Sequence, residues 1–459
     1  MRTLVLVDGQ HVVSVVRAAI DHLSATFART TVVGAALIGP GEKLADGDLA
    51  QLGTPVVAGG SGRDALEQGL VTFDPEIVVD LSDEPVLDAR RRLTMAARVL
   101  ARGIPYVGAD FRFDPPPRPR VATKPSVAVI GSGKRTGKTA VAAQVARLLA
   151  ARGTPPVIVA MGRGGPPEPE LVDPETFDLT PAGLLALTDQ GRHAASDHLE
   201  DAVTARVATV GTRRCGGGLA GAPFDSTFVA GVELANDRPE QLLVLEGSGA
   251  AIPPVYADAT VCIVPANAEP ELVCGYLGAY RVLLSDLVVV TMAEPSFADS
   301  GAVVLEKGVR GLAPGVGVVQ TVFRPFPLEP ISDRRVFFVT TAPASARDVL
   351  TEHLECEHGG KVVGTSHSLA DRRELAAELE AMPDADVLLV ELKAAAVDLA
   401  VRVALERGMD VTFCDNRVVS TGGDGTFDEL ALATVDQAIE RFNGHQRAVK
   451  DGRPQPPAR

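Results

Sequence analysis

The stretch Val127-Ala128-Val129-Ile130-Gly131-Ser132-Gly133-Lys134-Arg135-Thr136-Gly137-Lys138-Thr139 decides the fold of this chain. It joins a continuous apolar run to a Gly-rich turn, and the Ala-rich residues that follow predict a helix over 138–152. A turn of this kind between a buried strand and a helix is typical of a phosphate-binding loop. Glycines let successive backbone N–H groups face one anion, and the helix N-terminus adds its positive dipole end. We therefore predict a nucleotide-binding parallel sheet around this segment.

The loop also predicts which residues bind ATP. The candidate nucleotide-binding residues are Gly131, Ser132, Gly133, Lys134, Arg135, Thr136, Gly137, Lys138 and Thr139. The spacing departs from the usual G-x-x-x-x-G-K-[ST] pattern, because Ser132 stands where that pattern has its first glycine. We expect Lys138 to be catalytic and to reach the β- and γ-phosphates, and Thr139 to place its hydroxyl on Mg²⁺. Lys134 is a second candidate catalytic cation, with solvated surface charge as the alternative for it and for Arg135.

A P-loop enzyme needs a carboxylate near its metal ion, usually at the end of a neighbouring buried strand. Glu246 fits that position, since it ends the apolar run 242–245 and is followed by Gly247 and Gly249. We expect Glu246 to be catalytic and to bind Mg²⁺ together with Thr139.

Apolar runs alternate with helical patterns on both sides of the loop, which predicts an α/β protein in three parts. We expect an N-terminal doubly wound, Rossmann-like domain over 1–114, a Pro-rich linker over 115–124 and a P-loop ATP-binding domain with a parallel sheet over 125–307. A Gly/Pro-rich junction over 308–334 leads to a smaller C-terminal α/β domain over 335–443, whose last predicted strand is short, Val411–Cys414. The polar remainder, 444–459, is expected to be disordered.

Composition narrows the classes of function. The chain has 459 residues, a formal net charge of -15 and 46% hydrophobic residues, so it is a globular protein that would repel a polyanion over most of its surface. Its five cysteines are scattered without a C-x-x-C pair, which indicates neither a disulfide framework nor a zinc cluster. No uncharged apolar run reaches the ~18 residues of a membrane helix. We expect a cytoplasmic protein with no nucleic-acid and no membrane partner.

Two Gly/Arg stretches are candidates for binding a second, anionic substrate. Arg163 follows a predicted strand that ends at Ala160, so it should project at the carboxyl end of the sheet. Arg213, Arg214, Gly216 and Gly217 lie in the stretch 211–221, where paired guanidinium forks and free backbone donors suit phosphate or carboxylate. A flexible surface loop is the alternative for that stretch.

The first predicted strand, Thr3–Val7, is followed by further candidates for substrate binding. These are Asp8 and His11. A simple turn with a structural histidine is the alternative.

Together these motifs resemble one known family. V-D-G-Q-H at 7–11, the loop at 131–139, M-G-R-G-G-P at 161–166, T-R-R-C-G-G-G-L-A-G at 212–221 and L-E-G-S-G at 245–249 are similar to the cyclic 2,3-diphosphoglycerate synthetase family over most of the chain. The loop and E-G-S-G also resemble dethiobiotin synthetase. The resemblance implies that 2,3-diphosphoglycerate, a small phosphorylated substrate, is closed into a cyclic phosphoanhydride, with ATP and Mg²⁺ giving ADP and phosphate. The cations expected to bring the phosphates together are Lys134, Lys138, Arg163, Arg213 and Arg214.

Two alternatives remain open. One is another ATP-dependent ligase or cyclase of the dethiobiotin synthetase type. The other is a nucleotide switch of the partitioning-ATPase type that acts on a protein or DNA surface. Such switches carry a signature lysine five residues before the loop lysine, where this chain has Gly133. A homodimer is the expected assembly, although no residue pattern specifies it.

Overall fold

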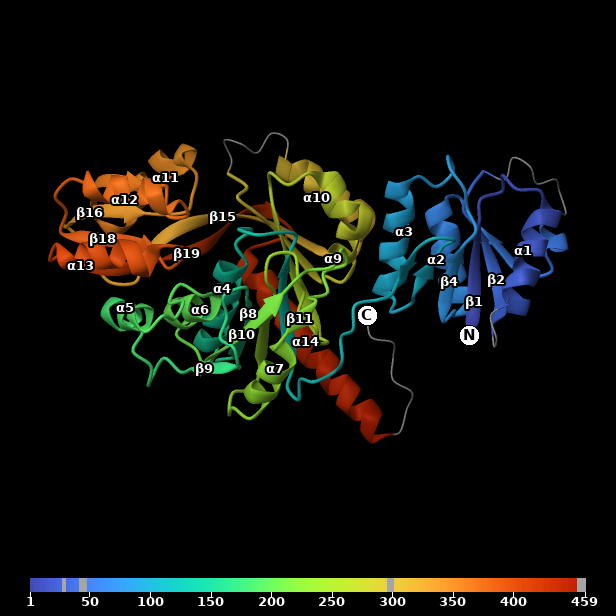
Figure 1. Ribbon diagram of the computed structural model, residues 1–459, viewed down its shortest axis with the longest axis horizontal. Helices are drawn as coiled ribbons and strands as arrows, with labels where there is room; N and C mark the ends of the chain where they lie inside the picture. The colour runs from blue at the N-terminus through green and yellow to red at the C-terminus, as the bar shows by residue number, and fades with distance from the viewer. Residues whose placement is uncertain (27–29, 41–47, 295–300, 452–459) are drawn as a thin grey trace.

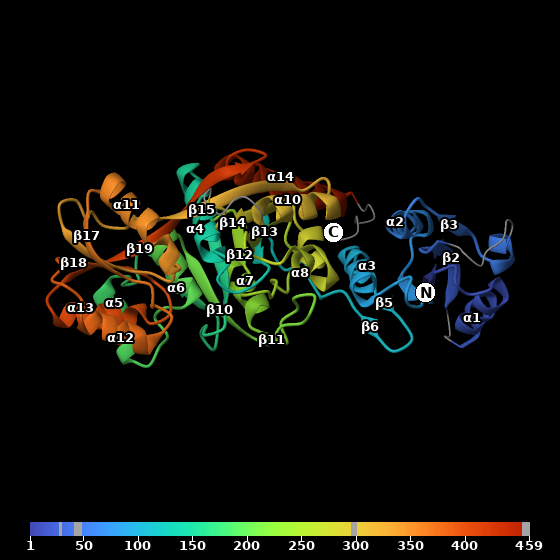
Figure 2. The ribbon, with the colours of Figure 1, turned by 90° about the horizontal axis from the view of Figure 1, so that it is seen from above.

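The computed structural model describes residues 1–26, 30–40, 48–294 and 301–451. It is an α/β protein in three parts along one long axis, with the P-loop part in the middle (Figure 1). The view from above shows the N-terminal and C-terminal parts at opposite ends (Figure 2). None of the helices in the described ranges is long and apolar enough to cross a membrane. The predicted fold class is confirmed.

The N-terminal part is built on a six-stranded sheet in the order β3-β2-β1-β4-β5-β6, parallel except for the last pair. Its strands are β1 (Arg2–Val7), β2 (Thr31–Leu37), β3 (Val56–Ala58), β4 (Ile77–Asp80), β5 (Tyr106–Val107) and β6 (Arg112–Phe113). Its helices are α1 (Val13–Thr26), η1 (Asp48–Leu52), α2 (Gly62–Phe73) and α3 (Ala89–Ala101). The last five residues of β1 are buried, as expected for a central strand of a parallel sheet. Residues 114–125 then carry no helix or strand.

The P-loop part has a parallel sheet in the order β10-β8-β12-β7-β13-β14-β15. These strands are β7 (Ser126–Gly131), β8 (Val157–Gly162), β10 (Thr209–Cys215), β12 (Leu243–Glu246), β13 (Ala259–Pro265), β14 (Leu287–Thr291) and β15 (Gly317–Pro327), with β9 (Glu170–Val172) and β11 (Asp225–Ser226) antiparallel to β10. The helices are α4 (Lys138–Ala151), α5 (Pro181–Asp189), α6 (Asp197–Ala205), α7 (Phe228–Asn236), α8 (Pro270–Cys274), η2 (Tyr276–Gly278), α9 (Ala279–Leu283) and α10 (Gly301–Leu312). The phosphate loop therefore leaves the sheet from a central strand, β7.

The C-terminal part continues this same sheet. β15 pairs antiparallel with β19, and the strands β19-β18-β16-β17 are then parallel. The strands are β16 (Arg335–Val339), β17 (Lys361–Ser366), β18 (Val387–Glu391) and β19 (Asp410–Gly423). The helices are η4 (Ala344–Ala346), α11 (Arg347–His358), α12 (Arg372–Glu380), the π-helical turn η5 (Ala396–Val401), α13 (Arg402–Glu406) and α14 (Phe427–Lys450).

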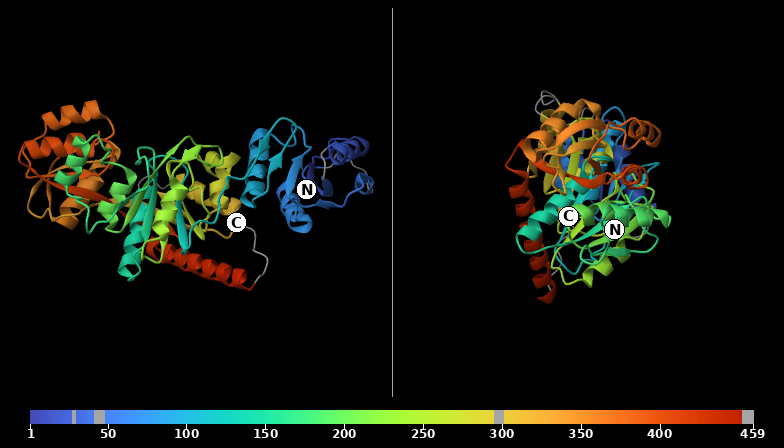
Figure 3. Two further views of the ribbon diagram at one scale, coloured as in Figure 1. Left: turned by 60° about the horizontal axis from the view of Figure 1, so that its bottom comes forward. Right: turned by 90° about the vertical axis from the view of Figure 1, so that its left-hand side faces the viewer.

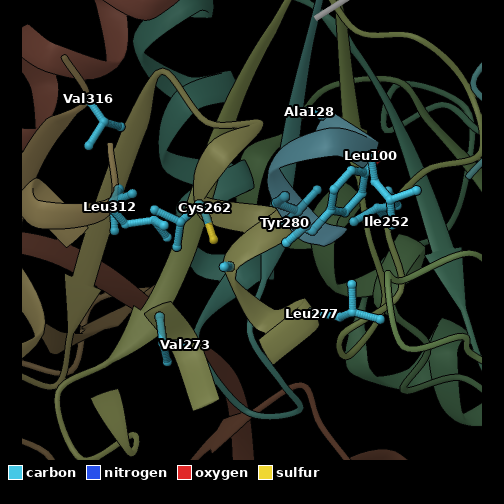
Figure 4. Close-up of a cluster of buried hydrophobic side chains, with 14 of the residues drawn as sticks. Leu100, Ala128, Ile252, Cys262, Val273, Leu277, Tyr280, Leu312 and Val316 are labelled. Carbon is cyan, nitrogen blue, oxygen red and sulfur yellow. The ribbon is translucent and has the colours of Figure 1, made fainter. Parts of the chain in front are cut away.

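Hydrophobic contacts join each end of the molecule to the middle. On the N-terminal side, Leu100 of α3 belongs to one buried cluster with Tyr280 of α9 and Leu277 of η2 (Figure 4). On the C-terminal side, Leu199 and Val203 of α6 pack in one cluster with residues of β16 and β18. The second contact matters for the site, because it holds α6 between the P-loop and the C-terminal strands.

The structure differs from the sequence-based expectation in two elements of the C-terminal half. The stretch 308–334, expected to be a junction, holds the end of α10 and the eleven-residue strand β15. The short strand expected at Val411–Cys414 extends to Gly423 because it pairs with β15 along nine residue pairs. Prolines are tolerated at the end of β15, since β14 pairs only with residues 317–320 and leaves that side of the strand open.

The expected disordered tail is also helical in its first residues. α14 continues to Lys450, and residues 452–459 lie outside the described residues. A capping box at Thr426 and Glu429 starts this helix, and Phe427, Val435 and Ala438 pack on the P-loop part. The packed half supports propagation of the polar half. Figure 3 shows α14 running along the middle of the molecule.

Candidate active site

The phosphate loop presents an uncapped helix N-terminus. α4 begins at Lys138 after Gly137, whose φ of 93° lies in the left-handed region, and no side chain caps the first turn. The first N–H groups of a helix have no partner within the helix, so those of α4 are available to an anion. Thr291 at the end of β14 donates its hydroxyl to the Thr136 carbonyl at 2.9 Å and so anchors the loop to the sheet. The predicted strand, loop and helix are confirmed.

Lys138 lies buried inside this loop. Its Nζ donates to the Gly133 carbonyl at 2.7 Å, and Thr136 Oγ1 lies 3.3 Å away. A Cβ at Gly131 would lie 3.1 Å from Lys138 Nζ, so the glycine leaves room for the lysine. Burial lowers the pKa of Lys138 to about 8, although Glu246 and Asp197 act in the opposite direction. An arriving phosphate would restore the charge that burial disfavours.

Thr139 and Glu246 meet at the start of α4. Thr139 Oγ1 donates to Glu246 Oε1 at 2.8 Å, and Glu246 is 1% exposed at the end of β12. Its second oxygen, Oε2, is buried and accepts no hydrogen bond from a described donor, although the Asp201 carboxyl is close enough to share a proton with Glu246. Burial first, and then Asp197, raise the pKa of Glu246 to about 7. A hydroxyl beside an incompletely bonded carboxylate suits a hard cation such as Mg²⁺.

Three further acidic residues face the loop from α6, and sequence reasoning missed them. Asp197, Glu200 and Asp201 are spaced i, i+3, i+4 and therefore share one helix face. Burial and the charge of Glu246 raise the pKa of Asp201 well above its usual value. Burial also raises the pKa of Asp197, against the opposing charge of Lys138. The signal in the sequence is D-H-L-E-D at 197–201, where acids occupy one side of a short helix.

The two Gly/Arg stretches meet over the turn after β12. A Cβ at Gly249 would lie 2.4 Å from Arg163 Nη2 and 3.2 Å from Arg214 Nη2, so both guanidinium groups lie against that glycine. Arg214 donates from Nη2 to the Ser248 carbonyl at 2.8 Å and from Nη1 to the Gly216 carbonyl at 2.7 Å. Gly217 lies beside the same side chain, since a Cβ there would lie 3.7 Å from Arg214 Nη1. Arg163 and Arg214, from two separate candidate stretches, therefore converge on one turn.

Arg213 does not join them. It is exposed, whereas Arg214 is half-buried, because successive side chains of β10 point to opposite faces. The stretch that sequence reasoning left as a possible surface loop is a strand as far as Cys215, since β10 pairs with β8 and with β11.

Asp8 and His11 also lie apart from the phosphate loop. They follow β1 in the separate N-terminal sheet, so the structure does not place them with the other predicted substrate-binding residues. The Asp8 carboxylate accepts backbone hydrogen bonds from Gln10 at 2.9 Å and Asp83 at 2.8 Å, and His11 Nδ1 lies 3.1 Å from it. These contacts order the turn after β1, which is the structural alternative considered from the sequence.

A cavity of about 760 Å³ connects the features around the loop. The P-loop part contributes Lys134, Arg135, Lys138, Thr139, Arg163, Asp197, Glu200, Glu246 and Gly249 to its lining. The C-terminal part contributes Thr341, Pro343, Ser345, Glu391, Lys393 and Asn416. Lys134 and Arg135 are exposed on the loop and border the cavity. The cavity is large enough for a nucleotide and a second small molecule.

A buried lysine in a strand–loop–helix turn, beside a hydroxyl–carboxylate pair, places the protein in the class of P-loop ATP-dependent enzymes. Family models narrow the class. Three models of cyclic 2,3-diphosphoglycerate synthetase match this chain. The model of the N-terminal domain matches residues 2–114, that of the P-loop domain residues 126–322 and that of the C-terminal domain residues 327–417. The chain belongs to the cyclic 2,3-diphosphoglycerate synthetase family, as its motifs led us to expect.

Individual relatives support this assignment over nearly the full length. Proteins named cyclic 2,3-diphosphoglycerate synthetase from Rubrobacter xylanophilus and Methanothermobacter thermautotrophicus are 46% and 42% identical to this chain. The matches cover 94% and 95% of this chain, and 98% and 97% of the relatives.

Among solved structures, LpxK from Aquifex aeolicus in complex with ATP matches with 12% identity and a TM-score of 0.37, covering 70% of this chain and 90% of LpxK.

Proposed function

We propose that this enzyme closes 2,3-diphosphoglycerate into cyclic 2,3-diphosphoglycerate and converts ATP to ADP and phosphate. Family membership supports the reaction, and one structural observation supports the site. A single cavity joins the cations of the phosphate loop to Arg163, which comes from a different strand. A nucleotide and a second polyanion can therefore meet in it. The same family membership disfavours the two alternatives, a ligase that acts on another acid and a nucleotide switch.

The phosphate loop would hold the nucleotide. The free N–H groups at the start of α4 and the ammonium group of Lys138 would face the β- and γ-phosphates, and Lys134 and Arg135 would add positive charge at the edge of the cavity. Thr139 and Glu246 would hold Mg²⁺, whose positive charge neutralises charge that develops on the phosphate oxygens. No group of three or more metal-ligating side chains occurs in the described part of the chain. That suits an ion held by one or two protein groups and by the phosphates of the nucleotide.

The chemistry would take place in two balanced steps. An oxygen of one substrate phosphate attacks the γ-phosphorus, and the bond to ADP breaks. The other substrate phosphate then attacks the substrate phosphorus that now carries the former γ-phosphoryl group. This step closes the ring and expels that group as inorganic phosphate. Arg163 and Arg214 would reduce the repulsion between the two phosphates, because both guanidinium groups approach the turn at Gly249. The predicted contribution of Arg213 has no support from its exposed position.

The proposal is tested by measuring ADP release from ATP and Mg²⁺ with and without 2,3-diphosphoglycerate, while phosphorus NMR follows the products. We expect ADP release that depends on the substrate, with new phosphoanhydride resonances. ADP release that ignores the substrate would favour the nucleotide switch instead. Release that depends on a different acid would favour another ligase.

We also infer a cytoplasmic location and a homodimer. All five cysteines are free thiols, which supports a reducing compartment. Cell fractionation tests the location. The homodimer stays a prediction, which light scattering of the purified chain at several concentrations would test.

A further inference from the structure

Lys393 brings a positive charge from the C-terminal part to the cavity. It follows β18, and its backbone N–H donates to the Glu391 carbonyl at 2.8 Å, which closes a tight turn. The next residue, Ala394, has a φ of 48°, in the left-handed region that L-residues rarely adopt. The turn points the chain toward the P-loop part, and Lys393 lines the cavity there.

The topology of the C-terminal strands explains this position. The parallel order β17-β16-β18-β19 puts β16 and β18 side by side, with β17 beyond β16 and β19 beyond β18. In doubly wound sheets, ligands bind outside the carboxyl ends of strands at such a switch point. Here the carboxyl ends of β16 and β18 border the cavity, because Thr341 after β16 and Lys393 after β18 both line it. The site described above therefore has a second wall that its phosphate-binding residues do not use.

The hydrogen bonds at this wall leave Lys393 available. The neighbouring carboxylate, Glu391, already accepts four hydrogen bonds. They come from Thr340 Oγ1 at 2.7 Å, Asn416 Nδ2 at 3.0 Å, Thr341 N at 2.9 Å and Thr341 Oγ1 at 2.7 Å. Lys393 Nζ instead lies 3.4 Å from Oε1 of Glu200, on α6. Of the three donors of an ammonium group, this contact occupies one.

Lys393 is a cation at neutral pH. Burial alone would lower its pKa, but Glu200 and Glu391 outweigh burial and raise it. Glu200 behaves oppositely, because burial raises its pKa to about 8. The ion pair is also long, with 3.4 Å between Lys393 Nζ and Glu200 Oε1, so a carboxylate that approaches Lys393 more closely could replace Glu200.

We propose that Lys393 binds the carboxylate of the substrate, and that Glu200 occupies its place when the substrate is absent. This inference rests on the proposed function. The two phosphates of the substrate must react with each other, so they belong near Lys138 and Arg163. The carboxylate takes no part in ring closure and can extend across the cavity to the C-terminal wall. A single ammonium group suits it, whereas Arg163 and Arg214 have the forked geometry that phosphates favour.

The test compares two ligands and a set of variants in the full chain. Glycerol 1,2-bisphosphate keeps both phosphates and replaces the carboxylate with a hydroxymethyl group. We expect Lys393→Met to weaken calorimetric binding of 2,3-diphosphoglycerate by about 10- to 100-fold, as for loss of a charge-assisted hydrogen bond. Binding of glycerol 1,2-bisphosphate and the KM for ATP should stay unchanged. Lys393→Arg should recover part of the loss, and Glu200→Gln should tighten binding of 2,3-diphosphoglycerate.

Lys361→Met is the matched control, because Lys361 begins β17 at the opposite edge of the same sheet and is exposed. It should bind both ligands like the wild type. Equal weakening of both ligands by Lys393→Met, or unchanged binding of 2,3-diphosphoglycerate, would overturn the assignment. Turnover separates the two proposals. A wild type that forms no cyclic product contradicts the proposed function, whereas an active wild type with an unaffected Lys393→Met variant contradicts only the role of Lys393.

Discussion

Two buried ionisable side chains at the phosphate loop have pKa values that are shifted toward neutral pH. Burial lowers the pKa of Lys138 to about 8 and raises that of Glu246 to about 7. Both shifts disfavour the charged form in the ligand-free enzyme. Binding of phosphates and a cation would reverse them, so the site is arranged to become charged when the nucleotide arrives.

Lys138→Ala should reduce ADP release by at least about 100- to 1000-fold, as removal of a key electrostatic donor does. The melting temperature should not fall, because burial disfavours the ammonium group of Lys138 in the folded state. Coupled-assay kinetics and a melting curve check both expectations. Lys307→Ala, at an exposed position of α10, serves as the control and should keep full activity. Activity close to that of the wild type in Lys138→Ala would show that the site is wrongly assigned.

Glu246 should make stability depend on pH in a specific direction. The pKa of Glu246 is about 7 in the folded protein, whereas an ordinary glutamate, as in the unfolded chain, has a pKa of 4.5. Between these two values the folded state therefore binds more protons than the unfolded state. The stability that Glu246 contributes is therefore complete below pH 4.5 and is lost as the pH rises to about 7. Urea unfolding across this range should show a steeper decline in the wild type than in Glu246→Gln, in which the other buried acids, such as Glu200, still titrate. Over the same range the apparent Mg²⁺ affinity of the wild type should rise, since Glu246 must lose its proton to bind the ion.

At the scale of elements, the strand β7, the loop and the helix α4 act as one unit. The loop is shaped by side chains that fold back over its own glycines. A Cβ at Gly131 would lie 2.8 Å from Thr136 Oγ1 and 3.0 Å from Lys138 Cδ. The contact at 2.8 Å would force the Thr136 side chain to shift, and the contact at 3.0 Å would push the lysine side chain slightly aside.

Gly131→Ala should therefore weaken ATP binding by up to about 10-fold, because the shift of Thr136 and Lys138 is smaller than the ~1 Å misplacement that costs about 100-fold. Gly315→Ala is a suitable control, since a Cβ there meets no atom within 4 Å. Titration with a fluorescent ATP analogue compares the two variants with the wild type. Unchanged affinity in Gly131→Ala would mean that the loop rearranges before it binds ATP.

At the scale of the whole molecule, buried ion pairs connect the C-terminal strands to the P-loop helix. Asp415 of β19 is buried and lies 2.9 Å from Arg147 of α4 and 2.8 Å from Arg417. Burial lowers the pKa of Arg147 to about 10 and raises that of Asp415. Such a cluster adds little stability as a whole, but it is costly to break, because removing one member leaves a buried charge without its partner.

Asp415→Ala should lower the free energy of unfolding by about 3 kcal/mol or more. Asp436→Ala removes the partner of Arg152 in a half-exposed pair between α14 and the residue that follows α4, and its effect should stay below about 1 kcal/mol. Chemical denaturation measures both. Equal effects in the two variants would mean that the link between β19 and α4 does not depend on Asp415.

The sequence by itself determined the strand, loop and helix around Lys138, the position of Glu246, and the family. Each of these depends on consecutive residues: glycines that allow a tight turn, a lysine and a threonine at the start of a helix, and a carboxylate at the end of an apolar strand. Such local chemistry can be read without knowing which strands are neighbours.

Only the tertiary structure decided which distant residues share the site. Strand order and helix packing bring Asp197, Glu200 and Lys393 to the loop, and they leave Asp8 and His11 in a separate sheet. Arg213 and Arg214 lie on opposite faces of β10, so Arg214 is half-buried while Arg213 is exposed. The length of β19 followed from its pairing with β15 rather than from its own residues. These features depend on contacts between residues far apart in the chain, which no short stretch of sequence specifies.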